Sequence, residues 1–210
     1  WWPLALAREL DDAILMLRTN EPELGLLLLR THGEADAVLA VDRTLRAEGA
    51  HWLVRETLGL LRRTLARLDV TSRSLYAIVE PGSCFAGTLL ELALAADRTY
   101  MLAVADDDES APAIALGETN FGAYPMGNGR TRLETRFDGD DAARDALDGR
   151  RDVVGERSER ARFGCHVRIL RASPGARITR SGNSGAVILS SQRCHPELVA
   201  GRRANVSVCG

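Results

Sequence analysis

The sequence predicts an α/β domain, and two observations favour that class. Short apolar runs typical of buried strands alternate with longer segments whose apolar residues recur at helical spacing. One stretch of the chain follows the order strand, glycine turn, helix and strand, which is typical of a parallel crossover unit. With 210 residues and 45% hydrophobic positions, the chain is long enough to bury one compact core or two small ones.

The N-terminal third of the chain predicts a helix, a strand and a second helix. Residues 4–17 carry leucine and isoleucine at helical spacing, and we expect this helix to end near Pro22. Residues 24–29 are almost continuously apolar, as expected for a strand that is covered on both faces. Between Val54 and Leu68 the apolar positions step by 4, 3, 4 and 3, which predicts the clearest helix in the chain, over residues 52–68.

The central segment contains the predicted crossover unit. Residues 74–79 are rich in Tyr, Ile and Val and predict a strand, which must turn at residues 80–82 because Pro and Gly follow it. A helix is expected over residues 87–96 and a second strand over residues 98–104. An acidic loop, residues 106–110, comes next.

The last quarter of the chain differs in composition. Residues 1–155 carry 17 Arg and 26 acidic residues, a net charge of −9, whereas residues 156–210 carry 10 Arg and 3 acidic residues, a net charge of +7. In the second part only residues 186–189 predict a strand. We therefore expect a domain over residues 1–155 and an irregular tail over residues 156–210, which is either disordered or an out-of-frame translation of a GC-rich coding sequence.

Composition also excludes several classes of partner and location. The longest apolar run, residues 24–29, is far shorter than the roughly 20 residues that cross a bilayer, so we expect no membrane span. Arginines of the tail neither cluster nor alternate with aromatic residues, so no nucleic-acid partner is expected. The first residues, Trp1-Trp2-Pro3, show no signal peptide and no natural start, and we expect the chain to begin inside a longer protein.

Cysteine and histidine positions argue against a metal site. The cysteines show no C-x-x-C spacing, which disfavours a disulfide framework or a zinc knuckle and favours a reducing compartment, the cytoplasm. The histidines likewise show no metal-ligand spacing. We expect Cys84 to be a small buried thiol more often than a nucleophile. The residues concerned are Cys84, Cys165, Cys194, Cys209, His32, His51, His166 and His195.

Residues 73–132 resemble a known family. They contain two unusual words, EPGSCFAG at residues 80–87 and NFGAYPM at residues 120–126. This segment is similar to the central part of the crotonase (enoyl-CoA hydratase) superfamily, and from residue 1 to about 137 the chain resembles the C-terminal half of benzoyl-CoA-dihydrodiol lyases. The resemblance implies a crotonase-like ββα spiral, present in part, that acts on a coenzyme A thioester and needs no metal or redox cofactor.

The resemblance also assigns candidate site residues. Glu91 and Glu118 match the two glutamates with which hydratases of the superfamily take one proton and give another. Gly87 and Thr88 match the turn whose backbone N–H groups form the oxyanion hole for the thioester, although Thr88 and Leu89 stand where the family has glycine. From the residues alone, Glu91 can equally bond backbone groups at the helix start, and Glu118 can be a solvated loop residue.

Two further features have open interpretations. Asp97 and Arg98 follow the predicted helix and favour a structural ion pair over a site. Residues 122–129, with Tyr124-Pro125-Met126, would form a loop beside the acyl pocket in the family, but these side chains can equally belong to the core.

By resemblance, the intact protein opens the dihydrodiol ring of benzoyl-CoA by hydrolytic C–C cleavage, releases formate and leaves a semialdehyde CoA thioester. Its implied partners are the acyl-CoA substrate, a missing N-terminal half of the same chain, and further copies in a homo-oligomer. One alternative is a non-catalytic structural half, because the lyases contain two crotonase-like halves and the first carries the more orthodox glycine-rich turn. The other alternative is a generic enoyl-CoA hydratase or isomerase.

Overall fold

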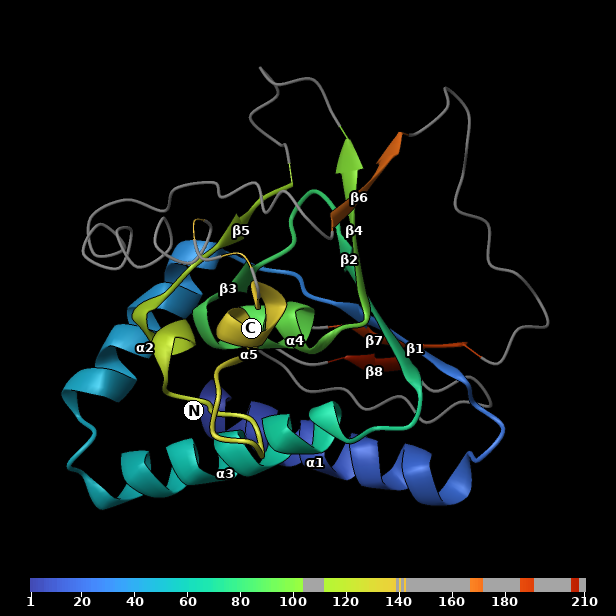
Figure 1. The fold of residues 1–210 in the computed structure, drawn as a ribbon. Coiled ribbons are helices and arrows are strands. Elements are labelled where there is room, and N and C mark those ends of the chain that lie inside the picture. Colours follow the sequence, from blue (N-terminus) through green and yellow to red (C-terminus); the bar gives the residue numbers. More distant parts are fainter. Residues whose placement is uncertain are drawn as a thin grey trace.

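The computed structural model describes residues 1–103, 112–138, 140 and 142, together with three strands at residues 167–171, 186–190 and 205–207. The elements are α1 (Trp2–Asn20), β1 (Leu26–Arg30), α2 (Ala35–Ala47), α3 (Trp52–Asp69), β2 (Ser74–Val79), β3 (Phe85–Ala86), α4 (Gly87–Ala95), β4 (Arg98–Ala103), β5 (Ile114–Ala115), the 3-10 helix η1 (Glu118–Phe121), α5 (Arg132–Arg136), β6 (Val167–Arg171), β7 (Ala186–Ser190) and β8 (Asn205–Ser207). This arrangement confirms the predicted α/β class (Figure 1).

A parallel sheet with the strand order β6-β4-β2-β1-β7-β8 forms the centre of the fold. Leu28 in β1 lies opposite Tyr76 in β2, and Val79 in β2 lies opposite Met101 in β4. Since α4 connects β2 to its parallel neighbour β4, the predicted crossover unit is confirmed. A second, two-stranded parallel sheet pairs β3 with β5, next to the start of α4.

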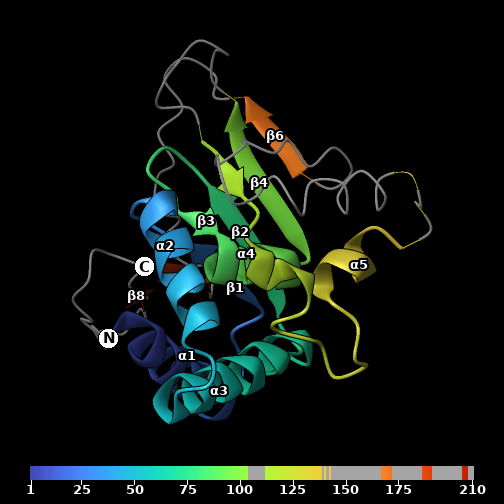
Figure 2. The ribbon, with the colours of Figure 1, turned by 90° about the vertical axis from the view of Figure 1, so that its left-hand side faces the viewer.

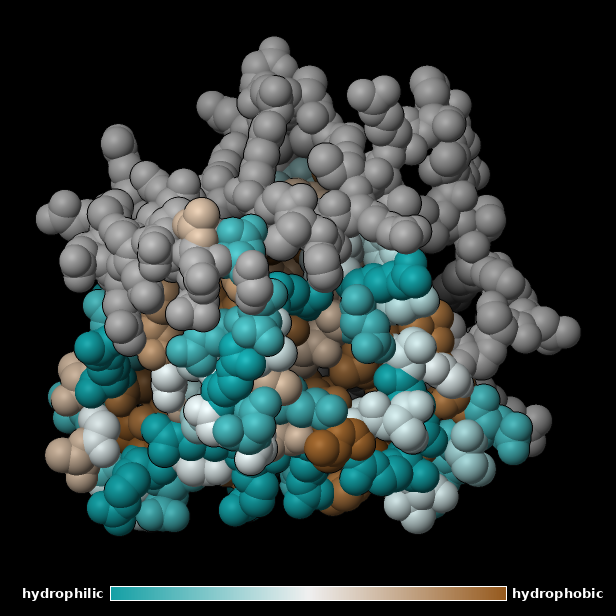
Figure 3. Space-filling view, viewed as in Figure 1, coloured by the Kyte–Doolittle hydropathy of each residue, from teal (hydrophilic) through white to brown (hydrophobic). Residues whose placement is uncertain are grey.

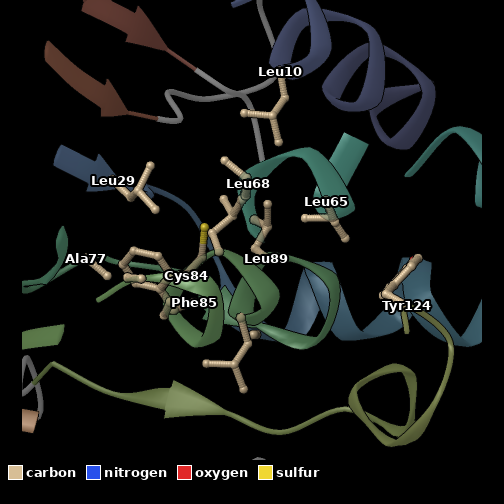
Figure 4. Close-up of a cluster of buried hydrophobic side chains, with 14 of the residues drawn as sticks. Leu10, Leu29, Leu65, Leu68, Ala77, Cys84, Phe85, Leu89 and Tyr124 are labelled. Atoms are coloured by element: carbon tan, nitrogen blue, oxygen red, sulfur yellow. The ribbon is translucent and has the colours of Figure 1, made fainter. Parts of the chain in front are cut away.

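The helices cover one face of the sheet and enclose the core. Leu10 of α1, Leu65 and Leu68 of α3 and Leu89 of α4 belong to the same buried cluster as Leu29 of β1 (Figure 4). These contacts explain why the predicted helices 4–17 and 52–68 form, since their leucine stripes meet a common core.

The prediction that the first strand is covered on both faces is wrong. Leu27 and Leu29 are each 1% exposed, whereas Leu26 and Leu28, which point to the other face, are only half-buried. Leu27 and Leu29 belong to the core that α1, α3 and α4 share. An apolar run therefore cannot distinguish a strand buried on two faces from one buried on a single face.

Helix α2 was not predicted from the sequence. It lies beside α4, as two perpendicular views show (Figures 1 and 2). Its buried residues are Val38, Leu39, Asp42 and Leu45, so a carboxylate takes one place in the stripe that an apolar residue would normally fill. The two-residue strands β3 and β5 were also missed, because two residues are too few to show a period.

Beyond residue 155 the structure describes only three strands. Strand β7 confirms the strand predicted at residues 186–189, and it pairs with β1 in the central sheet. Strand β6 pairs with β4, and β8 pairs with β7. The expectation of a strand at residues 186–189 alone is wrong, because β6 and β8 are further strands of this part of the chain. The acidic loop expected at residues 106–110 lies outside the described residues.

The surface shown in Figure 3 mixes hydrophilic and apolar side chains, with hydrophilic residues gathered along the lower edge over α3. Among the residues that the structure describes, no helix combines the length and apolar character needed to cross a membrane.

Candidate functional site

The first turn of α4 has a backbone shape that requires glycine. Gly87 has a φ of +44°, in the left-handed region. A Cβ atom at this position would collide with the carboxylate of Asp42, which reaches the turn from α2. The main-chain carbonyl of Gly87 accepts a hydrogen bond from Asn120 Nδ2 at 2.9 Å. The predicted site residue Gly87 thus lies where three elements, α2, α4 and η1, meet.

Thr88 binds Asp42 through both its main chain and its side chain. The backbone N–H of Thr88 donates to Asp42 Oδ2 at 2.7 Å, and the Thr88 hydroxyl donates to Asp42 Oδ1 at 2.6 Å. Asp42 Oδ2 also accepts from the Thr119 hydroxyl at 3.0 Å. The N–H group predicted to face a thioester oxyanion is therefore bonded to a carboxylate of the chain itself.

A chain of hydroxyl groups extends this contact to Tyr124. The Tyr124 hydroxyl lies 2.9 Å from Thr88 Oγ1. Because Thr88 has one hydroxyl proton and gives it to Asp42, Tyr124 is the donor to Thr88. Tyr124 is 2% exposed and belongs to the hydrophobic core, in a position apart from the leucine cluster (Figure 4). The core position is confirmed for Tyr124, whereas Pro125 and Met126 are only half-buried, and a loop beside an acyl pocket stays a prediction.

Glu91 lies one turn further along α4 and is bonded at both carboxylate oxygens. Oε1 accepts from Asn120 Nδ2 at 2.6 Å, and Oε2 accepts from Arg132 Nη1 at 2.8 Å. The same guanidinium donates to the two oxygens of Asp69, at 2.8 and 2.7 Å. Glu91 and Arg132 are both 2% exposed. Two carboxylates thus share one arginine in the interior.

This arrangement shifts the pKa of each buried carboxyl group upward. Burial raises the pKa of Glu91 to about 7, against the opposing effects of Arg132 and Asn120, and the charge of Asp69 adds to the rise. Burial likewise raises the pKa of Asp69. Burial raises the pKa of Asp42, although the hydrogen bonds from Thr88 and Thr119 act in the other direction. Glu91 consequently titrates near the range in which a general acid or base is useful.

Glu118 stands apart from the other predicted site residues. Its side chain is 43% exposed and forms an ion pair with Arg46 on the surface. Its neighbours Thr119 and Asn120 are the η1 residues that contact Asp42 and Glu91. The structure therefore brings Gly87, Thr88 and Glu91 together and leaves Glu118 at the rim.

In the described part of the chain, one hollow lies between α2 and η1 and another lies at the C-terminal end of α4. The smaller, about 30 Å³, is lined by Asp42, Thr119 and Glu118 among others, and has room for about one water. The larger, about 310 Å³, lies at the C-terminal end of α4 beside Asp69, Arg132 and Arg136. A benzoyl group fits neither the buried cluster nor the smaller hollow as the side chains stand.

Three residues of the cluster were missed by sequence reasoning. Asp42 has one local signal, since it occupies a buried position of an amphipathic segment. Asn120 and Arg132 fall inside the segment that carries the family resemblance, but nothing in the sequence marks them as partners of Glu91.

The remaining candidates have structural surroundings. Cys84 is fully buried, and its main-chain N–H donates to the Thr31 hydroxyl at 3.0 Å. The predicted ion pair of Asp97 with Arg98 is wrong, because Asp97 instead accepts the backbone N–H of Leu75 at 2.8 Å and so ties the end of α4 to β2. In the described part of the chain, no group of three or more His, Cys, Asp or Glu could hold a metal ion.

Comparison with known proteins finds one curated relative that is similar in sequence. No family model matches the sequence. Over 137 residues, 65% of this chain, the sequence is 61% identical to the curated benzoyl-CoA-dihydrodiol lyase of Aromatoleum evansii. The aligned part covers 24% of that protein, so the chain spans about a quarter of the length of the relative that it matches. The resemblance to benzoyl-CoA-dihydrodiol lyases that the sequence predicted is confirmed by this identity.

Proposed function

We propose that this chain is part of a carbon–carbon lyase that opens the dihydrodiol ring of benzoyl-CoA by hydrolytic cleavage and releases formate. The observation that carries the proposal is the 61% identity to a protein named benzoyl-CoA-dihydrodiol lyase. The parallel strands β1, β2 and β4 and the crossover helix α4 are compatible with a crotonase-like ββα spiral, of which this chain would hold a part.

In this function Glu91 and Glu118 would exchange protons with the substrate, and Gly87 and Thr88 would hold the thioester oxygen. A pKa of about 7 suits Glu91 for proton transfer near neutral pH. For these roles Asp42 would have to leave the Thr88 N–H, and Glu91 would have to exchange its bond to Asn120 or Arg132 for one to substrate.

A second role is favoured by a specific observation, the hydrogen bond from Thr88 N–H to Asp42. An oxyanion hole stabilises developing charge only if its donors are free to face the reacting oxygen. In a non-catalytic role, this segment would support a catalytic half elsewhere in the longer protein, and Glu91 would serve as a buried link between α4, η1 and α5. A generic enoyl-CoA hydratase would need the same donors free, so this bond disfavours it equally.

Several broader features belong to the same proposal. Hydrolytic ring cleavage transfers no electrons, so the proposed reaction needs no redox cofactor. We also propose that the intact enzyme works in the cytoplasm and as a homo-oligomer. We also propose a division of the chain at residue 155, which is supported by the change of net charge from −9 to +7.

The hypothesis of an out-of-frame tail is tested by translating the two other reading frames of the source DNA. If neither frame gives an amphipathic sequence that contains acidic residues, the hypothesis is wrong.

The decisive experiment measures turnover of a benzoyl-CoA dihydrodiol by the intact parent enzyme and by its Glu91→Gln and Glu118→Gln variants. A loss of about a hundredfold or more in kcat, with the fold intact, is the scale expected for removal of an acid/base group. Near-normal turnover would assign this segment a structural role. Glu56→Gln, which changes an exposed glutamate on α3, is the matched control and should retain full activity.

A further inference from the structure

The carboxylate of Asp42 is held as a ligand is held in a binding site. Each oxygen has its own donor: the Thr88 hydroxyl binds Oδ1, while the Thr88 N–H and the Thr119 hydroxyl bind Oδ2. Asp42 is 4% exposed, and none of the ion pairs formed in the described part of the chain involves it. The charge is therefore held by oriented neutral donors that match the two oxygens of a planar carboxylate.

The donors and the carboxylate come from different parts of the chain. Thr88 is the second residue of the nine-residue helix α4, whose N-terminal end favours a negative charge, and Thr119 lies on η1. Asp42 reaches them from α2, 46 residues before Thr88 and 77 before Thr119. The donors thus belong to α4 and η1, while α2 supplies the anion and, through Leu39, part of the wall beside Gly87 and Gly117.

The shape of the pocket is fixed independently of these hydrogen bonds. A Cβ at Gly87 would overlap Asp42, and a Cβ at Gly117 would lie 3.0 Å from the Cα of Gly87. Both positions lack a side chain where the carboxylate and its donors pack. The space is therefore sized for a carboxylate group at this point.

We propose that α4 and η1 form a binding site for a small carboxylate, that Asp42 is its resident ligand, and that truncation of Asp42 opens the site to formate. Replacing Asp42 by Ala removes a single carboxylate group, which has the size and the two oxygens of formate. The small hollow lined by Asp42 and Thr119 borders the site and gives a free anion a route to it. The inference depends on local geometry alone and holds whether or not the proposed lyase activity is correct.

The test measures thermal unfolding of the full 210-residue chain in sodium formate and in sodium chloride at the same ionic strength. We expect Asp42→Ala to unfold several degrees below the wild type, because three buried donors lose their acceptor. Formate should raise its Tm in a saturable way, as a ligand of the native state does, and chloride should not. Wild type should not respond to formate beyond its response to chloride, since its site is filled.

Two control variants make the result specific. Asp42→Asn keeps the space filled and should show no formate-specific rise in Tm. Asp36→Ala removes an exposed carboxylate from the same helix and should behave as wild type. An equal response of wild type and Asp42→Ala, or no response of Asp42→Ala, would overturn the proposal.

A second measurement applies where Asp42→Ala does not fold in buffer alone. The variant is refolded from denaturant with formate or with chloride, and native structure is followed by near-ultraviolet circular dichroism. Recovery that depends on formate supports the site, and failure to recover in either salt contradicts it.

Discussion

Two buried carboxylates, Asp42 against the first turn of α4 and Glu91 within α4, are stabilised in different ways. Asp42 is surrounded by uncharged donors, the hydroxyl and N–H groups of Thr88 and Thr119, whereas Glu91 is bound by the guanidinium of Arg132 and by Asn120. Both are almost inaccessible to solvent. At the first turn of α4, oriented hydroxyl and N–H donors bind the carboxylate. At the next turn, the carboxylate depends on the positive charge of Arg132, which it shares with Asp69.

The largest effect should come from removing that charge. Arg132→Ala would leave Glu91 and Asp69 buried without a counter-charge, and the loss of one partner from a buried ion pair is worth about 3–5 kcal/mol. Urea unfolding followed by circular dichroism measures the free energy of unfolding. Arg130→Ala is the matched control, because its pair with Asp138 is exposed and its removal should change the free energy of unfolding far less. Equal losses in the two variants would show that the shared arginine is not the main support of the cluster.

The second largest effect should be a dependence of the free energy of unfolding on pH that comes from Glu91. The pKa of Glu91 is raised from 4.5 to about 7 in the folded chain, so between these values the folded state holds a proton that the unfolded state has released. The free energy of unfolding should therefore fall as pH rises through this window, by up to roughly 3 kcal/mol. Stability that rises with pH between 4.5 and 7 would contradict the assignment.

The Glu91→Gln variant isolates this contribution. Glutamine does not titrate, so the variant should lose the part of the pH dependence that Glu91 supplies, while Asp42 and Asp69 keep theirs, with the same sign. Glu118→Gln is the control, because its exposed side chain should leave the curve nearly unchanged. The measurement is urea unfolding of each variant at a series of pH values.

The elements that the sequence predicts are those whose pattern of apolar residues lies within the segment itself. Helix α3 was predicted because its leucines repeat within the segment itself, and β2 was predicted to the residue because its apolar run is bounded by Pro81 and Gly82. Helix α2 was missed because Asp42 interrupts its apolar stripe. The residue that hides the helix from a periodicity argument is the one that links α2 to α4.

The candidate site was predictable only in part. The family resemblance marked Gly87, Thr88 and Glu91, which the structure places together at the start of α4. Their partners Asn120 and Arg132 lie 29 and 41 residues from Glu91, and no local rule relates positions so far apart. Hydrogen-bond partners of this kind follow from the tertiary fold, which brings η1 and α5 against α4.

A smaller effect is expected at the far end of the Asp42 hydrogen-bond chain. Tyr124→Phe keeps the buried ring and removes the hydroxyl that donates to Thr88. Thr88 still bonds to Asp42, so the loss should be about 1 kcal/mol, the usual net worth of one hydrogen bond. Thr88→Val is the informative companion, because it deprives both Asp42 Oδ1 and Tyr124 of their partner and should lose more. Urea unfolding of both variants checks the order, and a larger loss in Tyr124→Phe would mean that the chain is organised around Tyr124 instead of Asp42.

The smallest effect should come from the ion pair of Arg46 with Glu118 at the rim. Both side chains are largely exposed, at 66% and 43%, and exposed pairs contribute about 0–1 kcal/mol. Arg46→Ala should therefore leave the free energy of unfolding almost unchanged, and added salt should reduce the small difference from wild type further, because salt screens exposed charges. The same variant sharpens the comparison between interior and rim in the intact parent enzyme. If Glu118 exchanges protons with the substrate, its release from Arg46 should alter the pH profile of kcat. An unchanged profile would mean that Glu118 is a surface residue and that neither Glu118 nor Arg46 takes part in the reaction.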